Sequence, residues 1–384
     1  MKIKVLHIYR TYFPDSPGGV QEVIRQIALA TKAHGIESRI FALSPHPSST
    51  PISLAEGRIT QSKSLMAPAS CDIGGIESLR SFKKLVEWAD VVHYQFPWPF
   101  ADILHLLTDV KKPSLLTYQS DIVRQRMLAY LYTPLMKRML TSMSSIIATS
   151  PNYAATSPIL KKYASLSQLK IVPNGIADFC DNVVSGPINP TIQSLINQNR
   201  SFVLSIGVMR YYKGFHTLIE AALNIDTPVV LAGSGQEEDA LRNLAADIGA
   251  DNMIFLGQIS DDEKILLLRH CSVFVLPSHL RSEAFGMVLV EAAMFGKPLV
   301  CCEIGSGTSF INVDKETGYV VLPEDPLGLS KAINLLLKNK SLALEMGLAA
   351  RLRYEKYFSS AVLGRAYSLL YRDAVNQSSR FDQL

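Results

Sequence analysis

The sequence contains no stretch of about 18 uncharged apolar residues, so it offers no candidate for a membrane-spanning helix. Residues 1–10 carry positive charge, but their apolar run is too short for a secretory signal peptide and no small-residue cleavage site follows. We expect this stretch to form a first buried strand. Only five cysteines are present, an odd number without metal-ligand spacing, and a reducing cytoplasm is the simplest setting for them.

Motifs of several enzyme classes are also absent. The eight histidines form no His-Glu-x-x-His pair, and neither a Gly-x-Ser-x-Gly elbow nor a Walker lysine motif occurs. The acidic run Asp261-Asp262-Glu263 directly precedes an apolar stretch, so we interpret it as a helix cap with first-turn acids rather than as metal ligands. We therefore expect neither a metal ion nor a cofactor.

Basic residues are concentrated in the first half of the chain. Residues 1–180 contain 20 Lys and Arg against 12 Asp and Glu, whereas residues 181–384 contain 18 against 22. The first half should therefore meet an anionic partner. Because no signature of a nucleic-acid-binding module is present, we expect no nucleic acid and favour an anionic membrane surface.

Residues 124–138 are the candidate for that membrane contact. The segment has cationic ends and an apolar middle, made by Met127, Leu128, Leu131, Leu135 and Met136. A helix of this kind can lie in the headgroup layer of a bilayer. The alternative is a core helix with ordinary solvated Arg and Lys, which the interruption by Pro134 favours.

Strand-like and helix-like runs alternate along the chain, which predicts parallel βαβ units and an α/β fold. With 384 residues the chain is long enough for two doubly wound domains. We predict a first domain over 1–180, a linker rich in Asn, Ser, Pro and Gly over 181–200, and a second domain over 201–353. Residues 354–384 should form a helix that crosses back to the first domain. The predicted strands are 5–9, 39–43, 91–94, 114–118, 145–149, 202–206, 228–232, 253–256, 273–276 and 298–301.

Two of the loops that follow predicted strands combine glycine with groups that attract phosphate. Gly18 and Gly19 lie where a helix should start, and free backbone N–H groups at a helix start attract anions; a plain turn is the alternative. Gly207 opens a loop that also supplies Arg210 and Lys213, two cations able to neutralise a diphosphate.

Two further loops are weaker signals when taken alone. Gly233 and Gly235 follow a predicted strand but lack the third glycine of a dinucleotide fingerprint. Gly305, Gly307 and Thr308 can bring N–H groups and hydroxyls close to phosphate oxygens. All four loops lie at the carboxyl ends of predicted strands, where open α/β sheets bind ligands.

Glu283 and Glu291 lie around the start of a predicted helix that follows the strand at 273–276. Two ionised carboxylates on a rigid element can accept hydrogen bonds from two hydroxyl-rich groups, such as a sugar ring and a ribose. Phe285, Gly286 and Met287, at the helix start between them, are predicted to belong to the same ligand-binding site. The alternative is ordinary helix chemistry, because acidic residues favour helix starts.

With these glycine loops and the glutamate pair in this order, the chain resembles the retaining glycosyltransferases of family 4 over essentially its whole length. That resemblance implies the GT-B fold, in which two Rossmann-like domains face each other across a cleft. It implies an N-terminal acceptor-binding domain and a C-terminal nucleotide-sugar-binding domain. It looks most similar to bacterial mannosyl- and D-rhamnosyltransferases that build lipopolysaccharide O-chains, on the segments 7–15, 93–99, 117–123 and 302–308.

The resemblance implies that Glu283 contacts donor-sugar hydroxyls and Glu291 the ribose, while Arg210, Lys213 and the loop at Gly305 hold the diphosphate. Two departures from the family pattern stand out. The family commonly has Gly-Arg where this chain has Gly207-Val208, so Arg210 would have to reach the diphosphate from a later position.

The second departure is Gln119, which stands where the family often has a histidine near the 6-position of the donor sugar. Glutamine can donate and accept hydrogen bonds but cannot carry charge. The change suits a 6-deoxy donor such as GDP-D-rhamnose, and it suits neutral drift equally.

We therefore expect a GDP-sugar transferase that extends a lipid-diphosphate-linked glycan at the inner face of the cytoplasmic membrane, as in O-antigen biosynthesis. In this fold retaining transfer needs no protein nucleophile, because the departing diphosphate can accept the acceptor's proton. The alternatives are a transferase for UDP-N-acetylhexosamine or UDP-glucose, a sugar-nucleotide-binding protein without transfer activity, and a two-domain dehydrogenase. No complete Gly-x-Gly-x-x-Gly motif supports the dehydrogenase.

Overall fold

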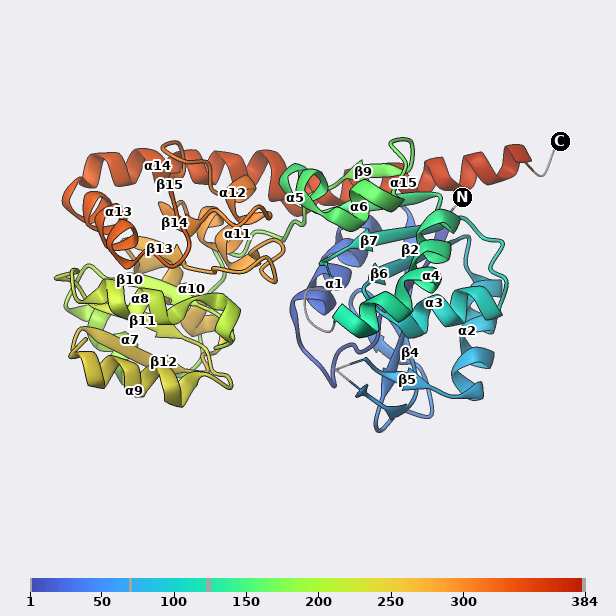
Figure 1. Cartoon of the computed structure of the whole chain (residues 1–384), viewed down its shortest axis with the longest axis horizontal. Helices are drawn as coiled ribbons and strands as arrows, with labels where there is room; N and C mark the ends of the chain where they lie inside the picture. Colours follow the sequence, from blue (N-terminus) through green and yellow to red (C-terminus); the bar gives the residue numbers. More distant parts are fainter. Residues whose placement is uncertain (1, 69–70, 122–125, 382–384) are drawn as a thin grey trace. The chain divides into compact units, whose positions relative to one another are not determined.

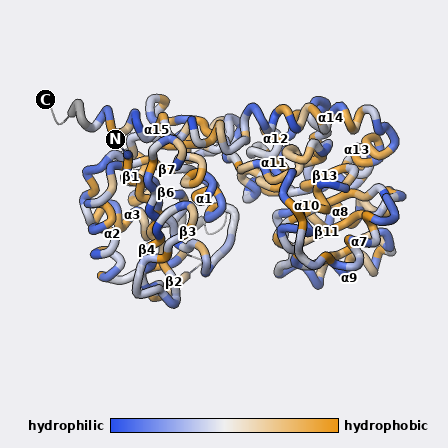
Figure 2. Tube along the Cα trace, turned by 180° about the vertical axis from the view of Figure 1, so that it is seen from behind, coloured by the Kyte–Doolittle hydropathy of each residue, from blue (hydrophilic) through white to orange (hydrophobic). Residues whose placement is uncertain are grey.

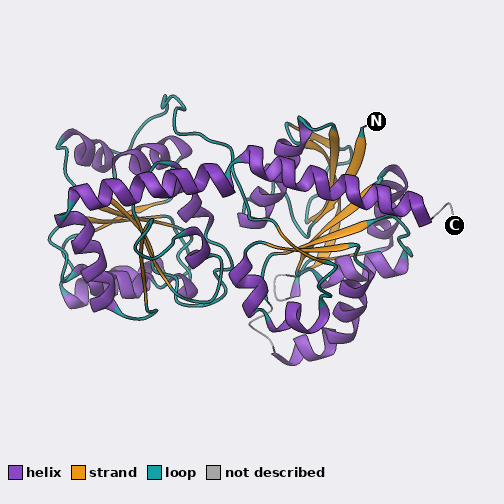
Figure 3. Cartoon of the chain, turned by 90° about the horizontal axis from the view of Figure 1, so that it is seen from above, coloured by secondary structure: helices purple, strands orange, loops and turns teal. Residues whose placement is uncertain are grey.

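The computed structural model describes residues 2–68, 71–121 and 126–381, with the side chains of 126–131 and 379–381 left aside. The chain forms two compact units (Figure 1). The first unit combines Met1–Ala177 with Ser360–Leu384, and the second is Asp178–Ser359. Each unit is a sheet with helices on both of its faces (Figure 3), as alternating strands and helices predict. The mixed α/β fold class is confirmed.

The described part of the first unit contains a nine-stranded sheet in the order β3-β4-β2-β1-β6-β7-β8-β9, with β5 paired to β4. The strands from β4 through β9 in this order run parallel, and the order reverses between β1 and β6, as in a doubly wound fold. The strands are β1 (Ile3–Ile8), β2 (Ile36–Ser44), β3 (Ile52–Leu54), β4 (Gly57–Met66), β5 (Ile73–Gly74), β6 (Val91–Phe96), β7 (Ser114–Tyr118), β8 (Ser145–Ala148) and β9 (Leu169–Ile171). The helices are α1 (Gly19–Lys32), α2 (Ile76–Trp88), α3 (Pro99–Leu107), α4 (Arg126–Ser142), α5 (Pro151–Thr156), α6 (Pro158–Tyr163) and α15 (Ser360–Phe381).

Four strands of this sheet, β3, β4, β5 and β9, were not predicted. β3 and β5 pair antiparallel with β4 at the edge of the sheet, and most of their side chains are partly exposed. The buried apolar runs that mark central parallel strands are therefore missing from this stretch.

The C-terminal helix α15 belongs to the first unit. Leu363, Tyr367 and Tyr371 on one of its faces are buried in a cluster with residues of β1, β6 and α1. Gly364 lets α15 approach α1 closely, because a Cβ atom there would lie 2.4 Å from the carbonyl oxygen of Ala30. Helix α15 therefore completes the core that covers one face of the sheet.

In the second unit, whose residues are all described, a six-stranded parallel sheet has the order β12-β11-β10-β13-β14-β15. The order reverses between β10 and β13, so the loops that leave these two strands lie at the switch point where such sheets bind ligands. The strands are β10 (Val203–Ile206), β11 (Val229–Ala232), β12 (Met253–Gly257), β13 (Val273–Leu276), β14 (Leu299–Cys302) and β15 (Gly318–Val321). The helices are α7 (Pro190–Asn197), the 3₁₀ turn η2 (Tyr211–Lys213), α8 (Phe215–Ala222), α9 (Glu238–Ile248), α10 (Asp261–His270), α11 (Met287–Met294), α12 (Thr308–Ile311), α13 (Pro326–Lys338), α14 (Lys340–Arg353) and the π-helical turn η3 (Tyr354–Phe358).

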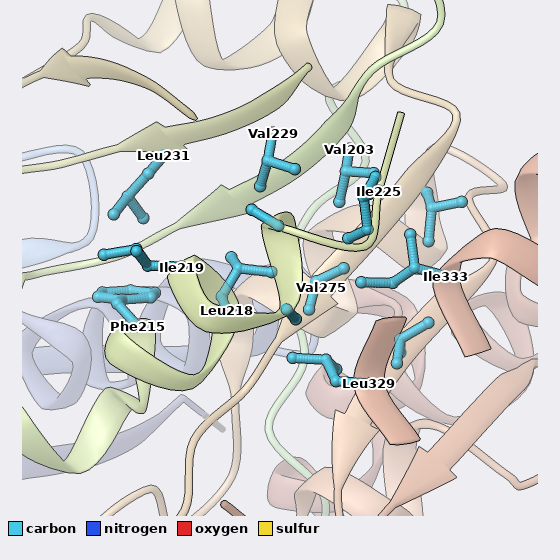
Figure 4. Close-up of a cluster of buried hydrophobic side chains, with 14 of the residues drawn as sticks. Val203, Phe215, Leu218, Ile219, Ile225, Val229, Leu231, Val275, Leu329 and Ile333 are labelled. Atoms are coloured by element: carbon cyan, nitrogen blue, oxygen red, sulfur yellow. The ribbon is translucent and has the colours of Figure 1, made fainter. Parts of the chain in front are cut away.

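The core of the second unit lies between its sheet and the helices α8, α9, α13 and α14. Figure 4 shows the part of it that α8 and α13 cover. Val203, Val229 and Val275 from three neighbouring strands meet Leu218 of α8 and Ile333 of α13, and all five are fully buried. Apolar stretches follow the central strands of both units, whereas polar stretches lie on the outer turns and helices (Figure 2). The loops at the strand ends of the second unit therefore leave from a closely packed core.

The predicted linker over 181–200 is wrong in its second part, and the unit boundary falls after Ala177 rather than after residue 180. Helix α7 occupies Pro190–Asn197 and buries Ile192 and Leu195. Pro190 is its first residue and Asn189 caps it, so the residues that we read as linker signals are those of a helix start. Likewise, η3 belongs to the second unit, so the returning segment begins at Ser360 rather than at 354.

The segment proposed for membrane contact forms much of α4. Residues 122–125, and the side chains of Met127, Leu128 and Leu131, lie outside the described residues. In the described part, Lys137 and Arg138 are exposed, but Met136 is only 4% exposed and belongs to the core. Among the described helices, none is both long and apolar enough to cross a bilayer.

Candidate functional site

A buried ion pair joins the two loops that leave the sheet of the second unit at its switch point. Lys213 ends the turn η2 after β10, and Glu283 lies in the loop between β13 and α11. The Lys213 ammonium donates to the Glu283 carboxylate at 2.5 Å, and both side chains are about one-tenth exposed. The Ser278 hydroxyl donates to the same carboxylate oxygen at 3.2 Å. The sequence predicted both charged residues but not their pairing.

The backbone keeps this pair in place. Gly214, directly after Lys213, has a φ of +68°, and a Cβ atom there would lie 2.1 Å from the carbonyl oxygen of Pro277. Only glycine therefore allows the η2 turn to pack this closely against the loop after β13. Burial alone would lower the pKa of Lys213, but the neighbouring Glu283 carboxylate outweighs burial and raises it. Lys213 is thus charged at neutral pH.

A second pair lies beside a pocket at the carboxyl ends of β10, β11 and β12. The Lys264 ammonium on α10 lies 3.3 Å from the Glu291 carboxylate on α11. Lys264 also lines a pocket of about 220 Å³ together with Gly207, Gly233 and Gln258. The other lining residues are Ile206, Val208, Ser234, Ile259, Ser260 and Asp261. Glu291 therefore lies next to a hollow that is lined by glycine backbone and by both polar and apolar side chains.

The loop at Gly305 is bound to the segment that carries Glu283. The Arg281 guanidinium donates to the carbonyl oxygen of Gly305, and the Gly307 N–H donates to the carbonyl oxygen of Ala284. Thr308 is buried, and its hydroxyl donates to the carbonyl oxygen of Cys302 at 3.2 Å. The Gly305 loop is thus hydrogen-bonded to the Glu283 loop. The Thr308 hydroxyl is already used in a hydrogen bond within the protein, to the carbonyl oxygen of Cys302.

Glycines of the predicted phosphate loops have a clear packing role. A Cβ atom at Gly233 would lie 2.1 Å from the carbonyl oxygen of Gly207, and one at Gly235 would lie 2.4 Å from that of Met209. The loops after β10 and β11 therefore run against each other without room for side chains. This contact brings Gly207 and Gly233 to the same pocket.

Three residues at the start of α11 also have defined positions. Gly286 precedes the helix in a left-handed conformation, and Met287 is the first helical residue. The Phe285 ring is buried and packs edge-on against Phe358. Its side chain thus belongs to the core of the second unit.

Arg210 and its neighbour Val208 are exposed on the loop after β10. Arg210 precedes η2, three positions before the buried Lys213. Arg210 is therefore an exposed charge near the ion pair, where it opposes the rise in the pKa of Lys213, and Lys213 is the cation of this loop that the fold has buried beside Glu283.

The predicted residues of the first unit lie at the ends of β1 and β7. Gly18 and Gly19 begin α1, and a Cβ atom at Gly19 would meet no atom within 4 Å. Gln119 follows β7, is 8% exposed, and donates through its side-chain amide to Gln95 at 2.8 Å. Its backbone N–H donates to the carbonyl oxygen of Phe96. Gln119 is thus held in an amide pair with no charge.

The acidic run at 261–263 serves as a helix start, as its position in the sequence predicts. Ser260 and Glu263 form a capping box at the start of α10. Asp262 accepts from the backbone N–H groups of Ser185 and Gly186. Among the described residues, a different group brings metal-ligand atoms together: His216, His279 and Glu324.

Sequence reasoning missed Lys264, Ser278 and Arg281. Each lies on a loop or first helical turn after a strand, but lysine, serine and arginine are common in such places. Their roles depend on contacts between segments far apart in the sequence, and no local pattern reports those contacts.

Comparison with known proteins agrees with this architecture. Residues 17–178 match the family model described as Glycosyltransferase Family 4, and residues 191–353 match that described as Glycosyl transferases group 1. The chain is 40% identical to the D-rhamnosyltransferase WbpZ of Pseudomonas aeruginosa, covering 93% of each chain. It is 38% identical to the O-antigen chain mannosyltransferase C of Escherichia coli, covering 98% of this chain and 100% of that one.

Solved structures share the fold at low sequence identity. Sucrose-phosphate synthase from Thermosynechococcus elongatus superposes with a TM-score of 0.76 at 21% identity, covering 97% of this chain and 99% of that one. HepE from Anabaena in complex with UDP gives a TM-score of 0.75 at 17% identity, covering 97% and 100%. At these identities the likeness concerns the fold alone.

Proposed function

Because this chain belongs to glycosyltransferase family 4, with the GT-B fold and near-full-length relatives that transfer mannose or D-rhamnose, we propose that it transfers one of these sugars from a GDP-sugar. The acceptor in this proposal is a lipid-diphosphate-linked glycan of O-antigen biosynthesis, and the anomeric configuration is retained. The observation that carries the proposal is the buried Lys213–Glu283 pair at the switch point of the second unit.

In the proposed reaction, Lys213 stabilises the negative charge that develops on the leaving diphosphate, and Glu283 accepts hydrogen bonds from the donor sugar. Such groups act by electrostatic stabilisation and positioning, because they are fixed before the substrate arrives. Glu291, beside the pocket with Lys264, is proposed to bind the ribose. The departing diphosphate takes the proton of the acceptor hydroxyl, so no protein nucleophile is needed.

Arg210 and the loop at Gly305 remain secondary candidates for diphosphate contacts. Arg210 is exposed, whereas the Gly305 loop is bound to the segment of Glu283. Gln119 is proposed to contact the donor sugar near its 6-position. Its neutral amide suits a 6-deoxy sugar or a hydroxymethyl group equally.

The membrane part of the proposal rests on the charge of the first unit. The protein is proposed to lie at the inner face of the cytoplasmic membrane, where a lipid-linked acceptor is presented, with Lys137 and Arg138 facing anionic headgroups. Flotation with vesicles of phosphatidylglycerol should carry the protein, and vesicles of phosphatidylcholine should not. Equal flotation with both would remove the electrostatic contact from the proposal.

The decisive experiment is product analysis with purified protein, synthetic lipid-diphosphate acceptors and a panel of nucleotide sugars. GDP-mannose or GDP-D-rhamnose should give a product of the expected mass, and NMR of the new linkage should show the anomeric configuration of the donor. Product from UDP-N-acetylglucosamine or UDP-glucose alone would overturn the choice of base. Tight GDP binding without product from any acceptor would favour a binding protein.

A further inference from the structure

Three side chains outside the proposed donor contacts come together at the carboxyl ends of strands in the second unit. His216 lies at the start of α8, His279 in the loop after β13, and Glu324 in the turn after β15. One ligand atom from each lies within 4.8 Å of the other two. The His279 Nε2 atom is 4.0 Å from the Glu324 carboxylate.

His279 is the unusual member of this group. Its side chain is 2% exposed, yet within the described residues neither of its ring nitrogens has a hydrogen-bond partner. Buried polar atoms in folded proteins nearly always have a partner, and an exception indicates a ligand, ion or water at that place. Burial lowers the pKa of His279, so the ring is neutral and offers a lone pair.

The surroundings of the two histidines hold their rings in place. Tyr211 stacks on His216, with ring centroids 5.6 Å apart, and meets His279 edge-on at 4.8 Å. The backbone N–H of His279 donates to the carbonyl oxygen of Tyr212. Glu324 is 62% exposed at its side chain and can move toward the rings without disturbing the core.

We propose that His216, His279 and Glu324 bind one divalent transition-metal ion, with Zn²⁺ the best match to two imidazoles and one carboxylate. Such ligands bind Zn²⁺ at about 2.0–2.2 Å and leave a position open for water or another ligand. The ligand atoms are already close enough that a rotation of the exposed Glu324 side chain, with small shifts of the rings, completes the set. Mg²⁺ prefers oxygen ligands in octahedral geometry and does not suit this site.

The ion would act as a clamp on the loops that hold the Lys213–Glu283 pair. His216 follows the η2 turn that carries Lys213, and His279 follows Ser278, which donates to Glu283. A metal bound to both histidines and to Glu324 joins the loops after β10, β13 and β15. Because the ion binds the folded state, it stabilises the second unit by mass action.

The test uses the full-length protein without a histidine tag, stripped with EDTA and titrated with Co²⁺, whose visible absorption reports histidine coordination. One equivalent of Co²⁺ should give a saturating band that Zn²⁺ abolishes and Mg²⁺ leaves unchanged, and Zn²⁺ should raise the melting temperature. Neither readout needs a sugar donor, so the result is independent of the proposed function.

Three variants and two controls decide the assignment. Glu324→Gln keeps the exposed side chain's shape and should weaken Co²⁺ binding at least about tenfold, because losing even a residue that only hydrogen-bonds to a metal ligand often costs that much. His216→Ala and His279→Ala should weaken binding further. The exposed His270→Ala and Glu316→Gln should bind like the unchanged protein. Unchanged affinity in Glu324→Gln and His216→Ala, or the absence of a stoichiometric Co²⁺ band, would overturn the proposal.

Discussion

The central parallel strands of the two units share one order, but the polar groups buried beside them differ in charge. In both sheets the order of these parallel strands reverses, between β1 and β6 in the first unit and between β10 and β13 in the second. At its reversal the second unit buries a charged pair, Lys213 with Glu283. In the first unit the corresponding strands β1 and β6 bury His7 and His93, and burial holds the pKa of both rings below the ordinary value, His7 at about 3.

The uncharged groups of the first unit form a network that reaches α15. The His93 Nδ1 and Nε2 atoms lie 2.8 Å from the Tyr371 hydroxyl and 2.7 Å from the Thr117 hydroxyl, and Thr117 lies 3.0 Å from Tyr367. These bonds tie the returning helix to the sheet. The same topology thus buries a charged pair in one unit, where we propose donor contacts, and uncharged groups that hold the returning helix in the other.

Removing the charge of Lys213 should have the largest effect. Lys213→Ala should lower the transfer rate about ten- to a hundredfold, the value of one charged hydrogen bond. It should also lower the free energy of unfolding by about 3–5 kcal/mol, because Glu283 is left as an unpaired buried charge. Initial rates with the nucleotide-sugar donor and urea denaturation measure the two effects.

A double variant separates the two roles of the pair. Lys213→Met with Glu283→Gln removes both charges, so it should regain much of the lost stability while the transfer rate stays low. The exposed Lys331→Ala is the matched control and should change neither quantity. A folded Lys213→Ala protein with unchanged turnover would show that the pair is structural, as the groups of the first unit are.

The second pair should have a smaller effect, confined to donor binding. Glu291→Gln should weaken GDP binding about tenfold, equivalent to about 1.4 kcal/mol, because the amide is a poorer acceptor for ribose hydroxyls than the carboxylate. Lys264→Ala should weaken it less, since its ammonium is partly exposed. Calorimetric titration with GDP measures both, and equal affinity in Glu291→Gln would place the ribose elsewhere.

Much of this site was predictable from the sequence because the relevant residues follow buried strands. The apolar runs at 202–206 and 273–276 predicted β10 and β13, and the loops after them contain Lys213 and Glu283. The pairing of Glu291 with Lys264, and the grouping of His279 with His216 and Glu324, depend instead on which strand-end loops become neighbours. Strand order decides that, and local periodicity does not report strand order.

The fold was less predictable where the same residue types are common in two kinds of structure. Pro190 and Asn189 occur in linkers and at helix starts alike, and only the burial of Ile192 distinguishes the two. The partly exposed β4 lacks the continuous apolar run of a central strand. The hydrogen bond between His93 and Tyr371 could not be predicted from the sequence, because it joins β6 to a helix at the other end of the chain.

A pH-dependent effect should distinguish the first unit. Asp102 on α3 accepts from the Tyr132 hydroxyl, and burial raises the pKa of Asp102 to about 8. In the unfolded chain the Asp102 carboxyl loses its proton near about pH 4. The contribution of Asp102 to stability is therefore full below about pH 4 and is lost as the pH rises to about 8.

Asp102→Asn removes the ionisation and keeps an acceptor for Tyr132. At pH 8 the variant should be more stable than the unchanged protein, by about 1–3 kcal/mol, and near pH 4.5 the gain should disappear. Urea denaturation across this pH range measures the difference. The exposed Asp109→Asn should show no such dependence, and a gain that is constant with pH would contradict a buried, protonated Asp102.

The smallest effect should come from the bonds that hold α15. Tyr371→Phe removes the partner of His93 Nδ1 and should cost about 1 kcal/mol, the typical value of one buried hydrogen bond. Tyr367→Phe should cost less, because its partner Thr117 keeps the contact with His93 Nε2. Urea denaturation gives both values, with Tyr163→Phe on α6 as the control. If Tyr367→Phe cost more than Tyr371→Phe, the His93 bond would not be the main polar link between α15 and the sheet, and the contrast with the charged pair of the second unit would weaken.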